Sequence, residues 1–375
     1  MRFAFYLFKY FPYGGLQRGF LHLAQECLSR GHQVEVYTGS WSGNRPDHLK
    51  ITCIQLKGIT NHSRYVYFAQ QVEQFALSRQ YDAIVGFNKM PGLDVYFASD
   101  VCYASLAKER SFLYRLTPRC RTLLSLEKAV FDPQSSTQII SISDQEMKRY
   151  ISCYGTPVHR FHSVPPGISK SRLDQANIPE TRMEVRRELN ISMESYVVVM
   201  VGSDYKRKGV DRAIYGMNSL PQRLKANTEL LIIGEGRVKP YIRLAKRLKI
   251  SPHIHFLGKR EDVPRLLAGA DLLLHPAYHE NTGTVLIEAL GAGLPVLATD
   301  VCGYASHVEL AKAGQIIPSP FQQQNLNIML MNMLESPSRA YWSENGKNYV
   351  KNTDVCGRHI KSADVIESIV KNKKQ

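Results

Sequence analysis

Two glutamates separated by seven residues are the side chains of this chain whose spacing most suggests chemistry. Glu280 precedes, and Glu288 follows, a hinge of small residues, Thr282-Gly283-Thr284, at which we expect a helix to begin. A carboxylate accepts two hydrogen bonds and therefore suits a pair of vicinal hydroxyls. The spacing predicts an elongated ligand with a diol near each end. The alternative is that Glu280 caps the helix and Glu288 lies on its surface.

The start of that predicted helix lies between the two carboxylates. The first N–H groups of a helix have no partner within it and carry partial positive charge, so they can bind phosphate. A nucleotide sugar has a diphosphate between two diols, one on the ribose and one on the hexose. We therefore predict that Glu288 binds the ribose and Glu280 the hexose. The residues expected to bind the phosphates are Thr282, Gly283, Thr284 and Val285.

Two adjacent cations follow a second predicted strand, VVVMVG at 197–202. Arg207 and Lys208 would neutralise a diphosphate there, Arg207 as a fork of donors and Lys208 as a compact charge. A solvated basic loop is the alternative. The spacing is not that of a Walker loop, because no GxxxxGK[ST] precedes a helix.

A glycine pair follows the first predicted strand. Gly14-Gly15 leads into a helical pattern over 16–30, so its backbone amides could approach an anion, and we assign both glycines to the binding of the donor. A tight strand-to-helix turn accounts for it equally well. Because the segment is not GxGxxG, it gives little support to a nicotinamide cofactor.

Asp100, at the end of the run DVYFASD, is a candidate for the reacting centre in the first half of the chain. Its alternative role is the N-cap of a helix over 101–108. A metal is not expected: no two aspartates are separated by one residue, and Pro276 breaks the helix that His275 and His279 would need to face one ion.

The segment 103–131 mixes charge with aromatic and leucine residues. It contains six Lys or Arg against two Glu, which suits contact with anionic lipid headgroups. Two amphipathic helices broken near Pro118 are the alternative, and nucleic acid would also fit the charge, but no RRM, KH or helix-turn-helix signature accompanies it. The predicted membrane contacts are Lys108, Arg110, Tyr114, Arg115, Arg119 and Arg121.

Short apolar strands alternate with helical patterns along the whole chain, which predicts an α/β fold with parallel sheets. The pattern restarts after PPG at 165–167, so we expect two Rossmann-like domains with a ligand between them. The expected bounds are 1–165 for an N-terminal acceptor domain and 166–355 for a C-terminal donor domain. A final helix within 356–375 is predicted to return to the N-terminal domain.

Composition narrows the class of protein. The chain has 375 residues and a net charge of +15, which favours an anionic partner. Its seven cysteines include no CxxC pair, which indicates reduced thiols in a cytoplasm. No run approaches the roughly 20 apolar residues of a membrane span, so we expect membrane contact to be peripheral.

With these residues in view, the chain resembles the family 4 retaining glycosyltransferases of the GT-B fold, and within them the lipopolysaccharide core glucosyltransferases of Gram-negative bacteria. The resemblance runs nearly end to end and depends on Glu280 and Glu288 together with the segments 9–18, 86–104, 202–212, 272–278 and 292–305.

The resemblance implies transfer of glucose from UDP-glucose to an inner-core heptose of lipopolysaccharide, with retention, in an α-1,3 linkage and without a metal or other cofactor. It also implies a location on the cytoplasmic face of the inner membrane. In such enzymes Arg172, Arg207 and Lys208 would contact the donor, and Asp100 would lie at the reacting centre. The expected catalytic residues are therefore Asp100, Lys208 and Glu280.

Three other functions stay open at this point. The same fold could use another UDP-hexose or a lipid-linked glycan acceptor. A UDP-sugar epimerase would need an acid/base pair and no lipid acceptor, which leaves the basic aromatic segment unexplained. A nucleic-acid-binding protein would show steep salt dependence and no affinity for UDP-sugars.

Overall fold

The computed structural model describes residues 1–12, 14–78, 81–175 and 181–373, which form two compact units. One unit comprises Met1–Gly167 and Gly357–Gln375, and the other comprises Ile168–Cys356. The chain thus passes between units at residue 167, where we expected 165, and returns at 356, where we expected 355. Both units have the α/β class that the sequence predicted.

In the described part of the first unit, seven parallel strands form one sheet in the order β3-β2-β1-β4-β5-β6-β7. The order reverses at β1, and ligands of such sheets bind beyond the carboxyl ends of the strands near the reversal. The strands are β1 (Arg2–Leu7), β2 (Gln33–Thr38), β3 (Lys50–Cys53), β4 (Ala83–Gly86), β5 (Val95–Ala98), β6 (Gln138–Ser141) and β7 (Phe161–Ser163).

Both faces of this sheet are buried, because side chains alternate between the faces along a strand. Phe3 and Phe5 of β1 pack with α1 and α17 on one face, while Ala4 and Tyr6 pack with α2 and α5 on the other. The helices of the unit are α1 (Gly15–Ser29), α2 (Asn61–Ser78), α3 (Tyr103–Lys108), α4 (Phe112–Arg115), α5 (Pro118–Phe131), α6 (Asp144–Tyr154) and α17 (Arg358–Lys373).

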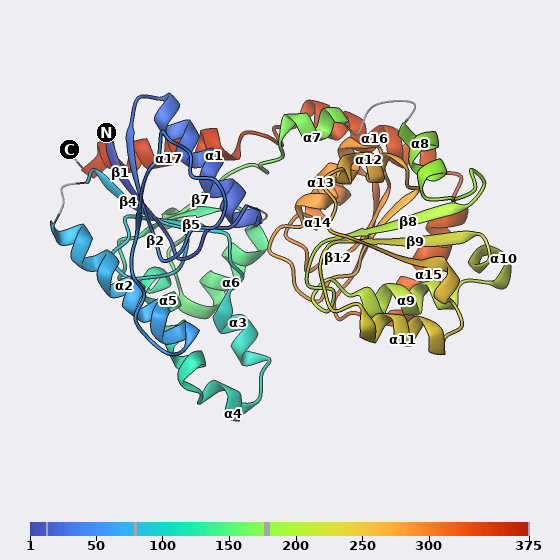
Figure 1. Cartoon of the computed structure of the whole chain (residues 1–375), viewed down its shortest axis with the longest axis horizontal. Helices are drawn as coiled ribbons and strands as arrows, with labels where there is room; N and C mark the ends of the chain where they lie inside the picture. The colour runs from blue at the N-terminus through green and yellow to red at the C-terminus, as the bar shows by residue number, and fades with distance from the viewer. Residues whose placement is uncertain (13, 79–80, 176–180, 374–375) are drawn as a thin grey trace. The chain divides into compact units, whose positions relative to one another are not determined.

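The last helix, α17, packs beside α1 in the first unit, as Figure 1 shows. Its Ala363 and Ile366 are fully buried in the core. Arg30, at the end of α1, donates to Asp364 at 2.8 Å and to Glu367 at 3.0 Å. Apolar burial and these ion pairs together hold the C-terminal helix on the first unit.

The second unit repeats the plan. Its described strands form a six-stranded parallel sheet in the order β10-β9-β8-β11-β12-β13, which reverses at β8. Residues that follow β8 and β11 therefore lie at the edge where ligands bind. The strands are β8 (Tyr196–Val201), β9 (Thr228–Ile233), β10 (Ile254–Gly258), β11 (Leu272–His275), β12 (Val296–Thr299) and β13 (Gly314–Ile317).

Helices cover both faces of this sheet as well. Figure 1 shows α9 and α11 on one face and α12, α13 and α16 on the other, in agreement with two separate apolar cores. The helices are α7 (Lys170–Gln175), α8 (Thr181–Glu188), α9 (Val210–Ser219), α10 (Gln222–Lys225), α11 (Lys239–Arg247), α12 (Val263–Ala268), α13 (Thr284–Gly291), α14 (Ala305–Ala311), α15 (Gln323–Glu335) and α16 (Arg339–Asn352).

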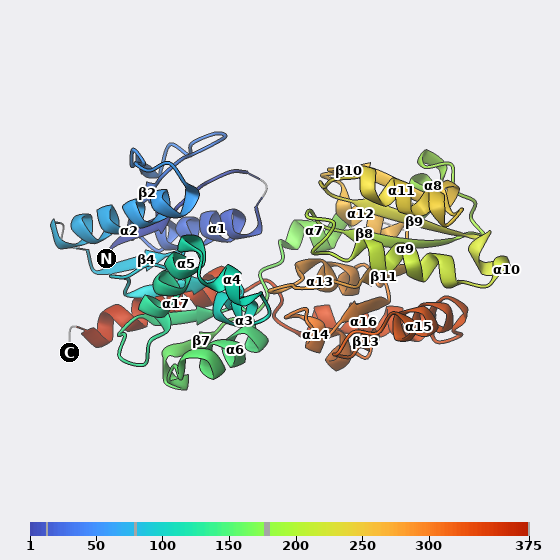
Figure 2. The same ribbon diagram turned by 90° about the horizontal axis from the view of Figure 1, so that it is seen from below.

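The basic segment differs from the expectation of two helices broken near Pro118. Three helices, α3, α4 and α5, gather there, as Figures 1 and 2 both show. Pro118 begins α5, with Thr117 accepting a hydrogen bond from the N–H of Cys120 as its N-cap. Proline suits the first turn of a helix, because the N–H that it lacks would have no partner there.

The described residues include no helix that combines the length and the apolar composition needed to cross a membrane.

All seven cysteines are free thiols, and four of them, Cys27, Cys102, Cys120 and Cys302, are buried.

Candidate active site

Arg207, Lys208 and Glu280 meet beyond the carboxyl ends of β8 and β11. The cations lie between β8 and α9, and Glu280 lies between β11 and α13. Lys208 Nζ donates to Glu280 Oε2, and Arg207 Nη1 donates to the same oxygen at 2.8 Å. The side chains of Lys208 and Glu280 are only 10% and 11% exposed. Two segments far apart in sequence, predicted to bind one ligand, are thus in direct contact.

The cations keep the carboxylate of Glu280 ionised. Burial alone would raise its pKa, but the charge of Lys208, a hydrogen bond with His275 and the charge of Arg207 hold the pKa well below its usual range. Among the described residues, the polar contacts of this carboxylate all go to Oε2. Oε1 has no polar contact among these residues.

His275, the last residue of β11, completes this cluster and was not predicted to belong to it. Its Nε2 lies 3.5 Å from Lys208 Nζ and 3.7 Å from Glu280 Oε2, and its side chain is fully buried. Burial and then Lys208 lower its pKa to about 4, so the imidazole is neutral at pH 7. A histidine in an apolar strand has the pattern of a core residue, so its part in this cluster could not be predicted from the sequence.

Metal ligands do not gather in the described part of the chain, where no group of three His, Cys, Asp or Glu could hold an ion. His279, considered above as a partner of His275 on zinc, instead presents its backbone carbonyl to Arg207 Nη1 at 3.2 Å. Activity without a metal stays a prediction.

Two glycines make room for Lys208 and its loop. Gly202 directly follows β8 and has φ +141°, and a Cβ there would lie 2.5 Å from Lys208 Cε. Gly209, the N-cap of α9, has φ +74°, and a Cβ would lie 2.1 Å from the carbonyl oxygen of Pro276. Side chains at these positions would displace either the lysine or the loop that carries Glu280.

Arg212 fixes the start of that loop, a role that the sequence did not suggest. Its guanidinium lies 3.6 Å from the ring centroids of both Tyr278 and Phe321, an arrangement typical of cation–π stacking. It also donates to the carbonyl oxygens of Pro276 at 3.1 Å and Ala277 at 2.9 Å. The loop between β11 and α13 is therefore fastened to α9.

Glu288 pairs with Arg172 in the same unit. Arg172 Nε donates to Oε1 at 2.8 Å and Nη2 donates to Oε2 at 3.2 Å, a two-point contact. Glu288 is the fifth residue of α13 and is largely buried, with 8% exposure, so it does not lie on an open surface. The structure brings together two residues that were assigned to the donor separately, and their ligand roles stay predictions.

The helix α13 begins as expected, at the small-residue hinge between Glu280 and Glu288. Gly283 is its N-cap with φ +79°, a left-handed conformation that favours glycine, and Thr284 is its first residue. Tyr304 N donates to Thr282 O at 2.8 Å and fixes the approach to the helix. The first-turn amides, including that of Val285, are of the kind that binds phosphate.

The glycine pair near the N-terminus begins α1. Gly14 is the N-cap and Gly15 the first helical residue, and Gly14 has an ordinary φ of −81°. A Cβ on Gly14 would lie 1.7 Å from Oε1 of Gln17, whose amide nitrogen donates to Lys9 O at 3.0 Å. Close packing, and not an unusual backbone conformation, accounts for glycine at 14. Its predicted contact with the donor remains a prediction.

Asp100 is not the N-cap of the following helix. The helix begins later than expected, at Tyr103, and its first amides are bound by glutamates: Glu127 accepts from Tyr103 N at 2.7 Å and from Ala104 N at 2.8 Å, and Glu146 accepts from Cys102 N at 2.6 Å. The carboxylate of Asp100 is thereby left for another partner.

Asp100 lines a cavity of about 350 Å³ in the first unit. Although it remains exposed, the protein atoms crowded around it raise the pKa of its carboxyl, an effect that Lys89 opposes and Glu127 strengthens. The other lining residues are Tyr65, Asn88, Lys89, Val101, Tyr103 and Leu123. Carboxylate, amide, ammonium and aromatic groups together suit a hydroxylated ligand.

In the basic segment, five of the six predicted membrane contacts are exposed: Lys108, Arg110, Arg115, Arg119 and Arg121. Tyr114 differs, because it is half-buried and its hydroxyl lies 2.9 Å from that of Tyr103. The structure adds three exposed apolar side chains that were not on the predicted list, namely Phe112 (64%), Leu113 (76%) and Leu116 (43%).

The sequence of each unit matches a known family. Residues 13–172 match the family described as Glycosyltransferase Family 4, and residues 181–349 match the family described as Glycosyl transferases group 1.

Similarity to one relative extends over nearly the whole chain. The sequence is 44% identical to lipopolysaccharide glucosyltransferase WaaG of Escherichia coli (strain K12) over 365 residues, which are 97% of this chain and 98% of that protein. The crystal structure of WaaG, a glycosyltransferase involved in lipopolysaccharide biosynthesis, matches with a TM-score of 0.90 and 43% identity, over 97% of this chain and 99% of that one.

More distant proteins match in structure or in sequence. A structure of Anabaena HepE in complex with UDP and glucose has a TM-score of 0.73 at 18% identity, over 98% of this chain and 100% of that chain. A D-inositol 3-phosphate glycosyltransferase of Jonesia denitrificans is 24% identical over 81% of this chain and 79% of that protein.

Proposed function

Because the chain belongs to the family of lipopolysaccharide glucosyltransferase WaaG, a GT-B member of glycosyltransferase family 4, we propose that it transfers glucose from UDP-glucose to an inner-core heptose of lipopolysaccharide. The product would carry an α-1,3 bond formed with retention. The observation that supports this proposal most directly is the contact of Arg207 and Lys208 with Glu280, which places two cations beside a carboxylate with one free oxygen.

In the proposed reaction, the bond between C1 of the hexose and the phosphate oxygen of UDP breaks while an acceptor oxygen bonds to C1 on the same face. The departing phosphate accepts the proton of the acceptor hydroxyl. Negative charge develops on the diphosphate, and Arg207 and Lys208 offset it inside a site with little water. Glu280 Oε1 orients the hexose, Glu288 the ribose, and the start of α13 the phosphates.

Asp100 is our proposal for the acceptor side. Its carboxylate lines the cavity of the first unit and is not used to cap α3, so it can accept a hydrogen bond from an acceptor hydroxyl. Held near the reacting oxygen, it would orient the hydroxyl toward C1.

Product analysis tests the function. Purified protein is incubated with a panel of radiolabelled UDP-hexoses and core-truncated lipopolysaccharide, with no added metal and with EDTA. We expect label from UDP-glucose to appear on the lipopolysaccharide, and we expect analysis of the product to show that the labelled glucose is joined by an α linkage. Transfer of galactose in its place would reject the donor assignment, and conversion of UDP-glucose to another UDP-hexose without acceptor would favour the epimerase.

Attachment to an anionic membrane surface is the second part of the proposal. The exposed cations of the basic segment lie close in sequence to the exposed Phe112, Leu113 and Leu116, and each cation near an anionic surface contributes roughly 1 kcal/mol. We expect the triple variant Arg115→Gln, Arg119→Gln, Arg121→Gln to bind vesicles containing anionic lipid on the order of 100-fold more weakly, as measured by vesicle sedimentation.

A matched control removes the same charge elsewhere. Arg243, Lys246 and Arg247 are exposed on α11 of the second unit, and their triple substitution by Gln should change vesicle binding much less. Equal losses in both triple variants would show that net charge, and not the segment 103–131, drives attachment.

A further inference from the structure

A buried ammonium lies in the wall of the Asp100 cavity. Lys89 is only 8% exposed, and its Nζ donates to the carbonyl oxygen of Val101 at 2.9 Å and to Oε2 of Glu127. It also lies 5.2 Å from the centroid of the Tyr150 ring. An ammonium has three N–H donors, so one is left after the two hydrogen bonds that the structure gives it. Lys89 lines the cavity together with Asp100.

The counter-ion of Lys89 has no capacity for a ligand. Glu127 is fully buried and accepts from Lys89, from the amides of Tyr103 and Ala104, and from the hydroxyl of Tyr154 at 2.8 Å. A carboxylate offers about four acceptor positions, and these four donors fill them, with a longer contact from the Cys102 thiol to Oε1 at 3.8 Å. Glu127 therefore fixes the wall of the cavity and neutralises Lys89. The third N–H of Lys89 remains available to a ligand in the cavity.

Stability alone does not explain such a pair. Removing two charges from water costs more than their attraction returns in many proteins, and apolar residues of similar volume are often as stable or more stable in the same place. A lysine that is buried, paired and in contact with a cavity is better explained by a ligand. The ligand must present an oxygen to it, because an ammonium only donates.

We propose that Lys89 is a further acceptor-binding residue: held by Glu127, its ammonium donates to an oxygen of the acceptor sugar in the cavity that Asp100 lines. This inference rests on the proposed function, because it takes the ligand of the first unit to be the acceptor. Lys89 and Asp100 would then bind different oxygens of one sugar ring. The ammonium would donate a hydrogen bond to one oxygen, and the carboxylate would accept a hydrogen bond from a hydroxyl.

The test separates binding from stability by comparing two variants. Lys89→Met removes the charge but leaves Glu127 buried without its counter-ion, so it lowers both stability and acceptor use. The double variant Lys89→Met, Glu127→Gln removes both charges and keeps the shapes. We measure the thermal midpoint, kcat/KM for core-truncated lipopolysaccharide, and Kd for UDP-glucose by calorimetry.

In Lys89→Met we expect kcat/KM for the acceptor to fall about 10- to 100-fold, the usual effect of losing one hydrogen bond to a charged group. We expect Kd for UDP-glucose to stay within about twofold, because Arg207, Lys208 and Glu280, which we assign to the donor, belong to the other unit. In the double variant the thermal midpoint should recover part of its loss, because the Gln amide has one acceptor oxygen where the carboxylate has two, but kcat/KM for the acceptor should not recover. The matched control is Lys128→Met, which changes a neighbouring, 68% exposed lysine and should leave all three measurements unchanged.

Recovery of kcat/KM together with stability in the double variant would overturn the inference, because Lys89 would then serve only the packing of α3 against α5. An unchanged kcat/KM in a folded Lys89→Met variant would overturn it as well. Failure of the proposed function is a different result, namely wild-type protein that binds no UDP-glucose or transfers no glucose to any lipopolysaccharide acceptor.

Discussion

Replacing Lys208 by alanine lowers kcat with UDP-glucose and lipopolysaccharide on the order of 10²- to 10³-fold or more, which is the largest effect on turnover that we expect. In the proposed reaction the diphosphate gains negative charge as the glycosidic bond breaks. Lys208 is buried beside Glu280, where a fixed charge acts with little screening by water. Arg207 is more exposed, at 39%, and does not replace it.

The measurement is kcat from initial rates at saturating donor and acceptor, with Kd for UDP followed by calorimetry. Ground-state binding should weaken less than kcat, because the missing charge matters most when the phosphate departs. Lys206→Ala is the matched control, since Lys206 is exposed in the same loop and should keep normal turnover. A Lys208→Ala variant that is folded and turns over at near the normal rate would refute the proposed role.

The fold was predictable because parallel strands that are buried on both faces have continuous apolar sequences. VVVMVG and LLLH mark β8 and β11 in this way, and the helix after β11 begins at the hinge where we expected it. The strand β7 was not predicted. It has three residues, Phe161–Ser163, at the edge of its sheet, and such a short polar segment has no periodicity to read.

The donor side of the site was predictable for a related reason. Residues that follow the carboxyl ends of neighbouring parallel strands must lie near one another, so Arg207, Lys208 and Glu280 could be assigned to one ligand from their positions in the chain. The resulting contact, two cations on one carboxylate oxygen, is consistent with that assignment. The polar partners that orient these residues could not be found in this way.

Glu127 shows why such polar partners could not be predicted from the sequence. It lies in a helix with no sign in the sequence that its side chain is fully buried, and its contact with Lys89, 38 residues earlier, exists only in the folded unit. His275 is hidden differently, because its neighbours Leu273 and Leu274 make it look like part of an apolar strand. In both cases the residue is placed by a tertiary contact with residues that share no pattern with it in the sequence.

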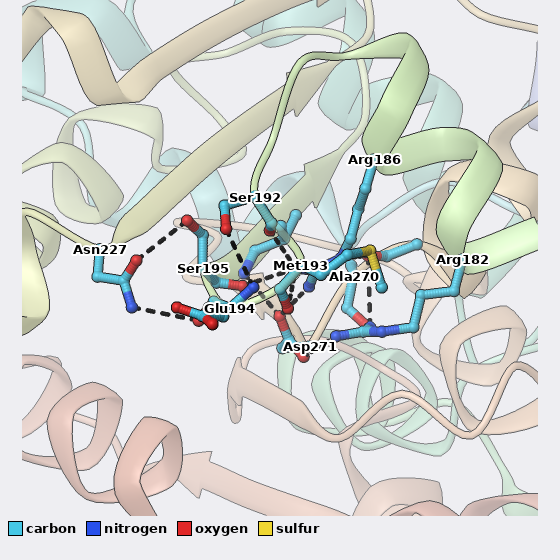
Figure 3. Close-up of polar contacts among 11 residues, drawn as sticks. Arg182, Arg186, Ser192, Met193, Glu194, Ser195, Asn227, Ala270 and Asp271 are labelled. Atoms are coloured by element: carbon cyan, nitrogen blue, oxygen red, sulfur yellow. Dashed lines mark hydrogen bonds and ion pairs between the residues drawn. The ribbon is translucent and has the colours of Figure 1, made fainter.

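Replacing Arg186 by methionine destabilises the second unit by about 3–5 kcal/mol, the largest effect on stability that we expect. Arg186 lies in α8 with 1% exposure, and its guanidinium binds the carboxylate of Asp271 at 2.6 Å, as Figure 3 shows. It also donates to four backbone carbonyls, those of Ser192, Met193, Ser195 and Gly269.

Methionine keeps much of the volume but leaves these carbonyls without their donor, and buried unpaired polar groups are costly. Asp271 would keep its contacts with Arg182 Nη2 and Val197 N, both at 2.7 Å, so the loss is partial and the chain should still fold. For a unit of this size, we expect scanning calorimetry to show a midpoint lower by on the order of 10 °C.

The neighbouring Arg187 is exposed, so Arg187→Met is the matched control and should change stability by less than about 0.5 kcal/mol. Catalysis distinguishes the Arg186 network from the active site. Asp271 and Val197 lie at the amino ends of β11 and β8, whereas Lys208 and Glu280 follow the carboxyl ends, so kcat measured well below the midpoint should be near normal. An unchanged midpoint would mean that water replaces the guanidinium at all four carbonyls. A midpoint that falls together with kcat at low temperature would mean that the two edges of the sheet are coupled.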